Sequence, residues 1–206
     1  MIHVPPEALP LLLQQRTQHA HLDNAEVERA VDAEIAQFVD TVGPLLPTAA
    51  TPQTFIDIGC GLGFGLLGLS RIYGARNLFV GIDRDAPTEE VIYGFSERPS
   101  SYNDLKATRL VLEAGGVQPD CIRLIDIDTQ PFPEVRADVV ISILAWGFHF
   151  PVATYLDQVD AALKPGGSLV IDIRRGLGGE KALAADYEQV GAVPGIKHDR
   201  CIFRRR

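Results

Sequence analysis

The sequence predicts an α/β fold: a single domain with a doubly wound, seven-stranded, mostly parallel sheet and a closing antiparallel hairpin. Three observations lead to this prediction. Short strand-like runs alternate along the 206 residues with stretches of helical length, as in parallel sheets covered by helices. A glycine-rich turn joins the first strand to the helix after it. Near the end of the chain, two short strand-like runs flank residues 195–199, which is typical of a hairpin.

Residues 1–50 are expected to form a helical extension ahead of the sheet domain, which spans residues 51–206. Prolines interrupt any early helix, at Pro5, Pro6 and Pro10. Asp23 or Asn24 caps a longer helix that runs to about Thr41. One face of this helix is apolar, with Val27, Val31, Ile35, Phe38 and Val39.

The remaining elements follow in the order that a doubly wound sheet requires. Strands are expected at residues 55–58, 77–83, 121–127, 137–144 and 168–173, with two more between 190 and 203. Helices are expected at residues 103–114, 155–163 and 180–189, the first capped by Asn103 or Ser101. Lys164, Pro165 and the two glycines after them predict a turn, because proline ends the preceding helix. Residues 86–102 are longer than most connections and aromatic, so they form either a substrate or lid loop or an insertion without function.

The glycine turn follows the strand at residues 55–58 and precedes an apolar helix that begins near Leu66. Glycine occupies every second position of the turn, at Gly59, Gly61, Gly63 and Gly65. Glycine adopts dihedral angles that other residues avoid and has no Cβ, so a ligand can contact bare backbone there. The first turn of the helix adds unpaired N–H groups and a positive dipole end, which suit an anion.

The spacing of these glycines disagrees with a dinucleotide site. The dinucleotide fingerprint is Gly-x-Gly-x-x-Gly directly after a strand. If the fingerprint starts at Gly59, its third glycine would have to be residue 64, which is Phe64. If it starts at Gly61, the third glycine would have to be residue 66, which is Leu66. The pattern does match from Gly63, but that start lies inside the expected helix.

The pattern that fits at the strand end is acidic-x-Gly-x-Gly-x-Gly, with Asp57 and then Gly59, Gly61 and Gly63. It resembles the first motif of the class I S-adenosylmethionine-dependent methyltransferases. The methionine end of that cofactor is a zwitterion, so Asp57 suits its ammonium group and the N–H groups of the turn suit its carboxylate. A pyrophosphate would be repelled by Asp57. The alternative is a tight turn that binds no ligand.

The second predicted strand ends in Asp83. In nucleoside-binding sheets, a carboxylate at this place accepts hydrogen bonds from both ribose hydroxyls. Asp83 therefore is a candidate cofactor ligand, the alternative being a helix cap. Arg84 or Asp85, which follow it, could flank the adenine ring.

The third predicted strand ends in Asp126 and Ile127, and a Pro-Phe-Pro turn follows three residues later. In the resembled family, an acid at this place accepts a hydrogen bond from the exocyclic amine of adenine, and the next backbone N–H donates to the ring. The resemblance assigns these two roles to Asp126 and Ile127. It also implies that helices ahead of the first motif cover the bound cofactor or substrate, which would make residues 1–50 a lid.

The stretch after the fourth strand holds the candidates for acceptor chemistry. It contains Trp146, Phe148 and His149, and open α/β sheets bind ligands at this end of their strands. His149 is the candidate catalytic base, because a hydroxyl acceptor must lose a proton during methylation. Trp146 and Phe148 are candidate substrate-binding residues. The alternatives are that His149 only orients substrate and that the aromatic residues belong to the core, with Asp172 as a lesser candidate base.

Composition excludes several classes of function. The formal net charge of −8 disfavours a nucleic-acid binder, which needs a basic surface. Three cysteines without a Cys-x-x-Cys pair favour a reducing compartment, the cytoplasm, and argue against structural zinc, so no metal is expected. The start of the chain lacks the features of a signal peptide, and no apolar run is long enough to span a membrane.

These features together predict an enzyme that uses S-adenosyl-L-methionine to methylate a small-molecule acceptor, with a hydroxyl group of a sugar or secondary metabolite as the leading candidate. The motifs for methylation of base amino groups and of pyrimidine carbon are absent, as are the paired acids of metal-dependent catechol enzymes. Three alternatives stay open: a cofactor-binding partner or sensor without activity, a nucleic-acid methyltransferase, and a nicotinamide-dependent reductase. The oligomeric state also stays open, with a homodimer as one possibility.

Overall fold

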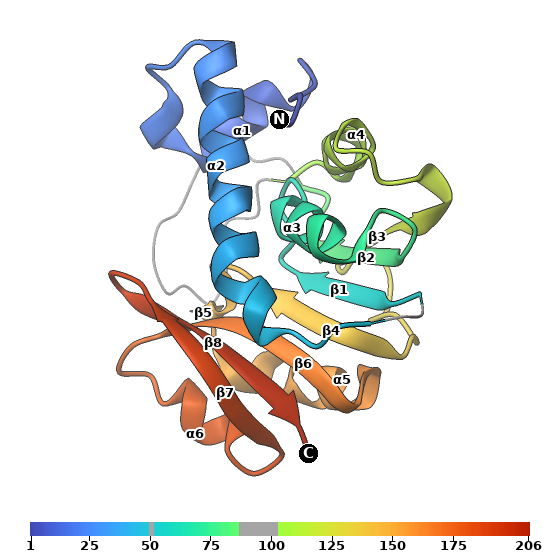
Figure 1. Cartoon of the computed structure of the whole chain (residues 1–206), viewed down its shortest axis with the longest axis vertical. Coiled ribbons are helices and arrows are strands. Elements are labelled where there is room, and N and C mark those ends of the chain that lie inside the picture. Colours follow the sequence, from blue (N-terminus) through green and yellow to red (C-terminus); the bar gives the residue numbers. More distant parts are fainter. Residues whose placement is uncertain (50–51, 87–102) are drawn as a thin grey trace.

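The computed structural model describes residues 1–49, 52–86 and 103–206. Seven strands form one sheet in the order β3-β2-β1-β4-β6-β8-β7 (Figure 1). Their bounds are β1 Thr54–Ile58, β2 Leu78–Asp83, β3 Ile122–Asp126, β4 Ala137–Ser142, β6 Leu163–Arg174, β7 Tyr187–Pro194 and β8 His198–Arg205. The first five strands pair in parallel, and β8 pairs antiparallel with β6 and β7. This topology confirms the predicted fold class and the closing hairpin.

Helices cover both faces of the sheet (Figure 1). One face carries α1 Leu9–Gln15, α2 Asn24–Val42, α3 Phe64–Tyr73 and α4 Leu105–Ala114; the other carries α5 Leu156–Ala162 and α6 Gly179–Leu183. Short 3₁₀ turns within the described ranges are η1 Thr17–His19, η2 Gly43–Leu45, η3 Pro119–Cys121 and η4 Val152–Thr154. One further strand, β5 Ala145–Phe150, does not belong to the seven-stranded sheet.

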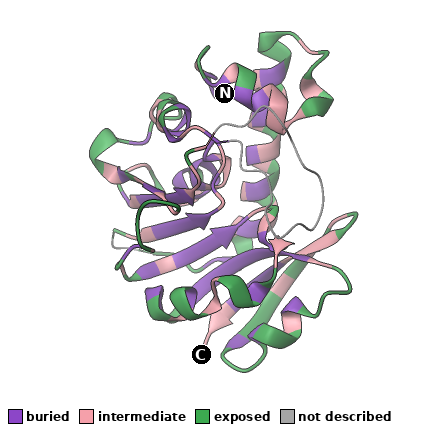
Figure 2. Cartoon of the chain, turned by 180° about the vertical axis from the view of Figure 1, so that it is seen from behind, coloured by how far each residue is buried: buried purple, intermediate pink, exposed green. Residues whose placement is uncertain are grey.

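The alternation of side chains along each strand divides the core in two. In β1, Phe55 packs with α2 and α3 on one face, whereas Ile56 packs with α5 on the other. Both side chains are fully buried, as expected for a parallel strand covered on two sides. Figure 2 shows buried residues along the central strands and exposed residues on the outer surfaces of the helices and the hairpin.

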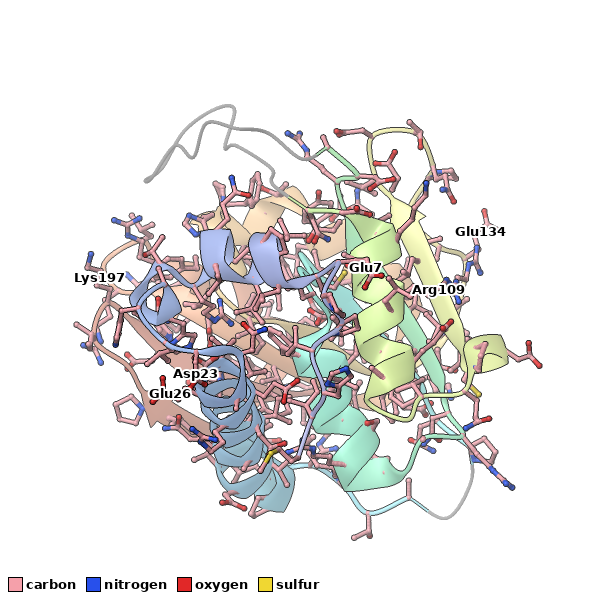
Figure 3. The ribbon with its side chains drawn as sticks, turned by 90° about the horizontal axis from the view of Figure 1, so that it is seen from above. Glu7, Asp23, Glu26, Arg109, Glu134 and Lys197 are labelled. Carbon is pink, nitrogen blue, oxygen red and sulfur yellow. The ribbon has the colours of Figure 1, made fainter. Side chains whose placement is uncertain are left out.

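The N-terminal extension packs into the same core as α3. A capping box starts α2: the Asp23 carboxylate accepts from Glu26 N–H at 2.8 Å, and the Glu26 carboxylate accepts from Asp23 N–H at 2.9 Å. Figure 3 shows both side chains together at the start of this helix. The expected cap and apolar face of α2 are confirmed. The expectation that Pro10 interrupts any early helix is wrong, because it occupies the first turn of α1, where its missing N–H costs no hydrogen bond.

Three other expectations about elements need correction. The helix expected at residues 180–189 ends at Leu183, and β7 begins at Tyr187, whose buried ring contacts Phe203 of β8 and whose hydroxyl donates to Asp160. The cap of α4 is Asp104 rather than Asn103 or Ser101. Strand β6 begins at Leu163, so the expected turn lies within its first residues.

Other features lie away from the strands. All three cysteines are free. Within the described ranges, no helix combines the length and the hydropathy needed to cross a bilayer. The expected substrate or lid loop at residues 86–102 lies outside the described residues from position 87 onward.

Candidate active site

A cavity of about 630 Å³ opens at the carboxyl ends of β1, β2 and β4. The strand order reverses between β1 and β4, and open α/β sheets bind ligands at such a point. The wall combines the glycine turn, the end of β2, strand β5, the end of α1 and the tip of the β7–β8 hairpin. Its charged and imidazole side chains are Arg16, Asp57, Asp83, Arg84, His149, Lys197 and His198.

Asp57 is a buried carboxylate in this wall. Only 2% of the residue is exposed, and its Oδ1 atom has no hydrogen-bond partner among the described residues. Burial, and then the nearby charge of Asp83, raise the pKa of Asp57 well above its usual range. A buried acceptor without a donor is unfavourable, so this position suits a ligand that brings a positively charged donor.

The backbone of the glycine turn adopts conformations that residues with a side chain disfavour. Gly59, Gly61 and Gly63 have φ angles of +72°, +50° and +81°, in the region that favours glycine. A Cβ on Gly65, at the start of α3, would lie 2.8 Å from Asp57 Oδ2. The N–H groups of Phe64 and Gly65 belong to the first helical turn, so the i→i−4 bonds of α3 do not use them. The turn can therefore bring backbone donors close to an anion beside Asp57.

Asp83 links the end of β2 to the glycine turn. Its Oδ2 accepts from Gly61 N–H at 2.7 Å, and its Oδ1 accepts from Arg84 N–H at 2.8 Å. Burial raises the pKa of Asp83 to about 6 despite these two hydrogen bonds. Each carboxylate oxygen has a second lone pair, so Asp83 can still accept from ligand hydroxyls. Arg84 also lines the cavity, and its Nε lies 3.2 Å from Asp128 Oδ1.

The structure does not bring Asp126 to the cavity. Its carboxylate accepts from Thr129 Oγ1 at 2.7 Å and from Asp128 N–H at 3.2 Å, so it caps its own turn. The pKa of Asp126 is lowered below its usual range, and the hydrogen bond from Thr129 is the largest cause. Ile127 does line the cavity, but its N–H donates to Asp83 O at 3.0 Å. The adenine contacts assigned to this pair therefore stay predictions.

The acceptor candidates meet at β5. The rings of Phe148 and His149 are edge to face at 4.9 Å, and both residues line the cavity. Trp146 borders it as well, although its side chain is fully buried and its indole N–H donates to Val152 O at 2.8 Å. Its ring therefore packs as part of the core. Asp172 is also fully buried, does not line the cavity, and accepts two hydrogen bonds from Arg200.

Several cavity residues carry no signal in the sequence, because elements distant along the chain supply them. Gln15 and Arg16 come from the end of α1, and a Cβ on Gly61 would lie 3.4 Å from Gln15 Oε1. Asn103 donates to Gly61 O at 3.0 Å and is almost fully buried. Its Oδ1 is a second buried acceptor without a hydrogen-bond partner in the described part of the chain. Lys197 and His198 come from the hairpin tip.

Across residues 1–49, 52–86 and 103–206, no three metal-ligating side chains of the His, Cys, Asp or Glu type are clustered so that they could hold an ion. The cavity wall combines a buried carboxylate without a donor at Asp57, the bare backbone of the glycine turn, a second carboxylate at Asp83, and the aromatic and imidazole side chains of β5.

Comparison with known proteins places this site in context. The family model described as a methyltransferase domain matches residues 56–171, more than half of the chain. No curated protein matches the sequence significantly.

Solved structures with a similar fold include a ribosomal protein L11 methylase from Lactobacillus delbrueckii subsp. bulgaricus. It is 14% identical, with a TM-score of 0.60, and the match covers 84% of this chain and 79% of that one. A Listeria monocytogenes protein provisionally assigned as an S-adenosylmethionine dependent methyltransferase is 12% identical, with a TM-score of 0.55 and coverages of 83% and 99%. A Nostoc punctiforme protein provisionally assigned as an O-methyltransferase is 12% identical, with a TM-score of 0.53 and coverages of 83% and 60%. At these identities the similarity establishes the fold and not the acceptor.

Proposed function

The chain belongs to the S-adenosylmethionine-dependent methyltransferase family, and on this premise we propose that it methylates an oxygen atom of a small-molecule acceptor. When bound, the cofactor supplies an electrophilic methyl group on a positively charged sulfur. The observation that carries the proposal is the continuity of the cavity. One space joins Asp57, Asp83 and the glycine turn to the aromatic and imidazole side chains of β5. Its volume lies within the range of small-molecule sites.

Each polar group of the cofactor would meet protein groups of complementary charge or hydrogen-bonding type. Asp57 would accept from the ammonium group, which supplies the donor that its Oδ1 lacks among the described residues. The N–H groups of Phe64 and Gly65 would bind the carboxylate, together with Arg16, which lines the same cavity. Asp83 would accept from the ribose hydroxyls. The buried unpartnered atom of Asp57 and the bare glycine backbone fit this zwitterion.

The acceptor would occupy the compartment next to β5. Phe148 would bind its apolar part, and His149 would take the proton from the hydroxyl group as the methyl group is transferred. Trp146 would support this wall from the core. Burial of the reacting atoms among aromatic side chains would exclude water from the site, and positioning would supply most of the rate.

The N-terminal extension would close the cofactor compartment. Gln15 and Arg16 line the cavity from the end of α1, and Gln15 lies next to Gly61 of the glycine turn. Residues 1–50 would therefore act as a lid over the domain of residues 51–206, as the sequence predicts. A nucleic-acid acceptor is disfavoured by the net charge of −8.

Calorimetric titration with S-adenosylmethionine, S-adenosylhomocysteine and NADH tests the cofactor site. We expect micromolar binding of the first two ligands, no binding of NADH, and loss of binding in Asp83→Ala. Asp120→Ala, an exposed carboxylate in η3, is the matched control and should bind normally. Folding of each variant is checked by circular dichroism. Binding of NADH alone would mean that the glycine turn serves a dinucleotide.

Formation of S-adenosylhomocysteine tests the reaction. Pools of phenols, sugars, carboxylic acids and RNA are incubated with the protein and cofactor. We expect turnover only in small-molecule pools, with most of the rate lost in His149→Gln and cofactor binding unchanged. Turnover with RNA alone would overturn the proposed acceptor class. Cofactor binding without turnover in any pool would favour a sensor or a non-catalytic partner.

A further inference from the structure

The two ends of the cavity differ in charge. Both carboxylates in its wall, Asp57 and Asp83, lie at the cofactor end. At the other end, β5 and the hairpin tip contribute His149, Lys197 and His198, and none of the described lining residues there is acidic. This asymmetry occurs in a chain with a net charge of −8, so the overall composition does not explain it.

The acids nearest to the hairpin tip are already paired. Asp172 accepts from Arg200 at 2.8 and 2.9 Å, and it also accepts from Leu144 N–H at 3.1 Å. Asp199 accepts from Arg175 at 2.6 and 3.0 Å. The charge of each of these carboxylates is therefore balanced by an arginine.

The other lining cations are also balanced, which distinguishes Lys197. Arg16 pairs with Glu34 and Arg84 pairs with Asp128, both at 3.2 Å. Within the described ranges, no acid lies within ion-pair distance of Lys197 Nζ. Lys197 thus leaves an unbalanced positive charge at the mouth of the acceptor compartment.

The hairpin tip is held in place rather than loosely attached. Arg175 N–H donates to Lys197 O at 3.2 Å, and the Arg175 side chain donates to Ile196 O at 3.3 Å. Next to Lys197, the His198 ring is edge to face with Phe148 at 5.4 Å and lies 3.5 Å from Asp172. Figure 3 shows Lys197 at the outer edge of the molecule. An exposed lysine and a partly buried imidazole on consecutive residues therefore both line the cavity from a hydrogen-bonded turn.

From this arrangement we propose that the acceptor is a small molecule with a carboxylate or phosphate group, which Lys197 and His198 bind at the mouth of the cavity. A lysine ammonium and an imidazole N–H both donate to such oxygens, and charge-assisted hydrogen bonds are the strong ones. The apolar part of the acceptor then lies against Phe148, and its hydroxyl group lies near His149. The inference rests on the proposed function, since it names the class of acceptor for the same site.

The test uses the protein loaded with S-adenosylhomocysteine, so that no turnover occurs. Amide chemical shifts are followed by NMR during titration with benzoate, phenyl phosphate and neutral benzyl alcohol at constant ionic strength. We expect at least one of the anions to shift residues 195–198 saturably at millimolar concentration, and benzyl alcohol to bind more weakly. The two anionic arms distinguish a carboxylate from a phosphate.

Variants separate this site from general attraction of anions. Lys197→Gln should weaken anion binding about tenfold, as expected for loss of one charge-assisted hydrogen bond. Lys197→Arg should retain most of it. Lys106→Gln, an exposed lysine on α4, is the matched control and should have no effect. Equal binding of benzoate and benzyl alcohol, absence of saturable binding by both anions, or an equal loss in Lys106→Gln would overturn the inference.

Failure of this inference is distinguishable from failure of the proposed function. Binding of S-adenosylhomocysteine is measured first, and its absence would count against the proposed function. Normal cofactor binding with no preference for anions would overturn only the assignment of the acceptor class.

Discussion

Two carboxylates dominate the site at the scale of single residues. Asp57 and Asp83 lie on neighbouring strands, and burial raises the pKa of each. Neither is paired with an arginine or lysine in the described structure, in contrast to Asp172 and Asp199. Carboxylates in such an environment favour the binding of cations and hydroxyl donors, because a ligand can replace the solvation that burial removes.

Cofactor affinity should therefore depend on pH. A bound ammonium group and bound hydroxyls favour the charged forms of Asp57 and Asp83, so affinity falls as pH decreases through the pKa of Asp83, about 6, and the raised pKa of Asp57 acts in the same direction. The loss is up to about tenfold per pH unit for each proton. Titrations in buffers of different ionisation enthalpy should show proton release near this pH. Affinity that is constant across this range would contradict the assignment.

The free energy of unfolding of the ligand-free protein should change with pH in the opposite direction to cofactor affinity. The folded pKa of Asp83 is about 6 against an ordinary value of 3.8, so the folded state binds the proton more tightly. Between these values the free energy of unfolding decreases as pH rises.

Asp126 is the control for the pH dependence of cofactor binding, because its pKa is lowered whereas that of Asp83 is raised. Asp126→Asn should therefore leave the pH midpoint of cofactor binding unchanged.

Arg16 should recognise the carboxylate of the cofactor. We expect Arg16→Gln to weaken binding of S-adenosylmethionine about tenfold, as for loss of a hydrogen bond to a charged group. Binding of the decarboxylated cofactor should not change, because the group that Arg16 contacts is absent. Calorimetry on both ligands provides the measurement, and Arg29→Gln, exposed on α2, is the control. An equal loss for both ligands would mean that Arg16 acts only through the fold.

At the scale of elements, the turn between β1 and α3 depends on the space that its glycines leave. A Cβ on Gly59 would lie 2.3 Å from the Cβ of Ala145, which precedes Trp146 at the start of β5. The turn is also fixed from α4, because Asn103 and Thr108 both donate to Gly61 O. The glycine turn and the start of β5 are therefore packed against each other.

Gly65→Ala should separate ligand binding from folding. The new Cβ would lie 2.8 Å from Asp57 Oδ2 and 2.7 Å from Ile141 Cδ1, so the carboxylate must move. Alanine favours the helix by up to ~1 kcal/mol, which offsets part of the strain. We expect at least about a tenfold loss of cofactor affinity with a folded protein. In the control Gly43→Ala the Cβ would be 3.5 Å from Ile72, an ordinary contact, and affinity should be retained.

At the scale of the whole molecule, the cavity joins distant parts of the chain. Residues from α1, the glycine turn, β5 and the hairpin tip all line it, so a bound ligand connects the N-terminal extension to the last two strands. A ligand that binds only the folded state stabilises that state in proportion to its concentration and affinity.

S-adenosylhomocysteine should therefore raise the melting temperature of the entire chain in one transition. At a concentration 100-fold above the dissociation constant the stabilisation is about 2.7 kcal/mol. For a chain of this size this corresponds to a shift of roughly 5–10 °C. Differential scanning calorimetry measures it, with NADH as the control that should give no shift. Two separate transitions would show that the extension folds independently of the site.

Local sequence was sufficient for much of the fold and for part of the site. The strands and α2 were predictable because alternation, helical periodicity and capping act over a few residues, as the capping box at Asp23 illustrates. Asp57, Asp83 and the glycines were predictable because strand, turn and acid are adjacent in the chain. The helix expected at residues 180–189 was not, because burial of Tyr187 against β8 outweighs local helix propensity there.

The sequence by itself determined the fold class and the family, and it singled out Asp57, Asp83 and the glycine turn, which line one cavity, because these features depend on motifs of neighbouring residues. Only the tertiary structure decided which distant side chains complete that cavity. Arg16, Asn103 and Lys197 come from three different elements, and no spacing along the chain relates them. It also directed Asp126 into its own turn and placed Lys197 of the hairpin tip in the wall of the same cavity as Asp57 and Asp83. Burial and pairing of charges are properties of neighbours in space, which is why the structure was needed to assign them.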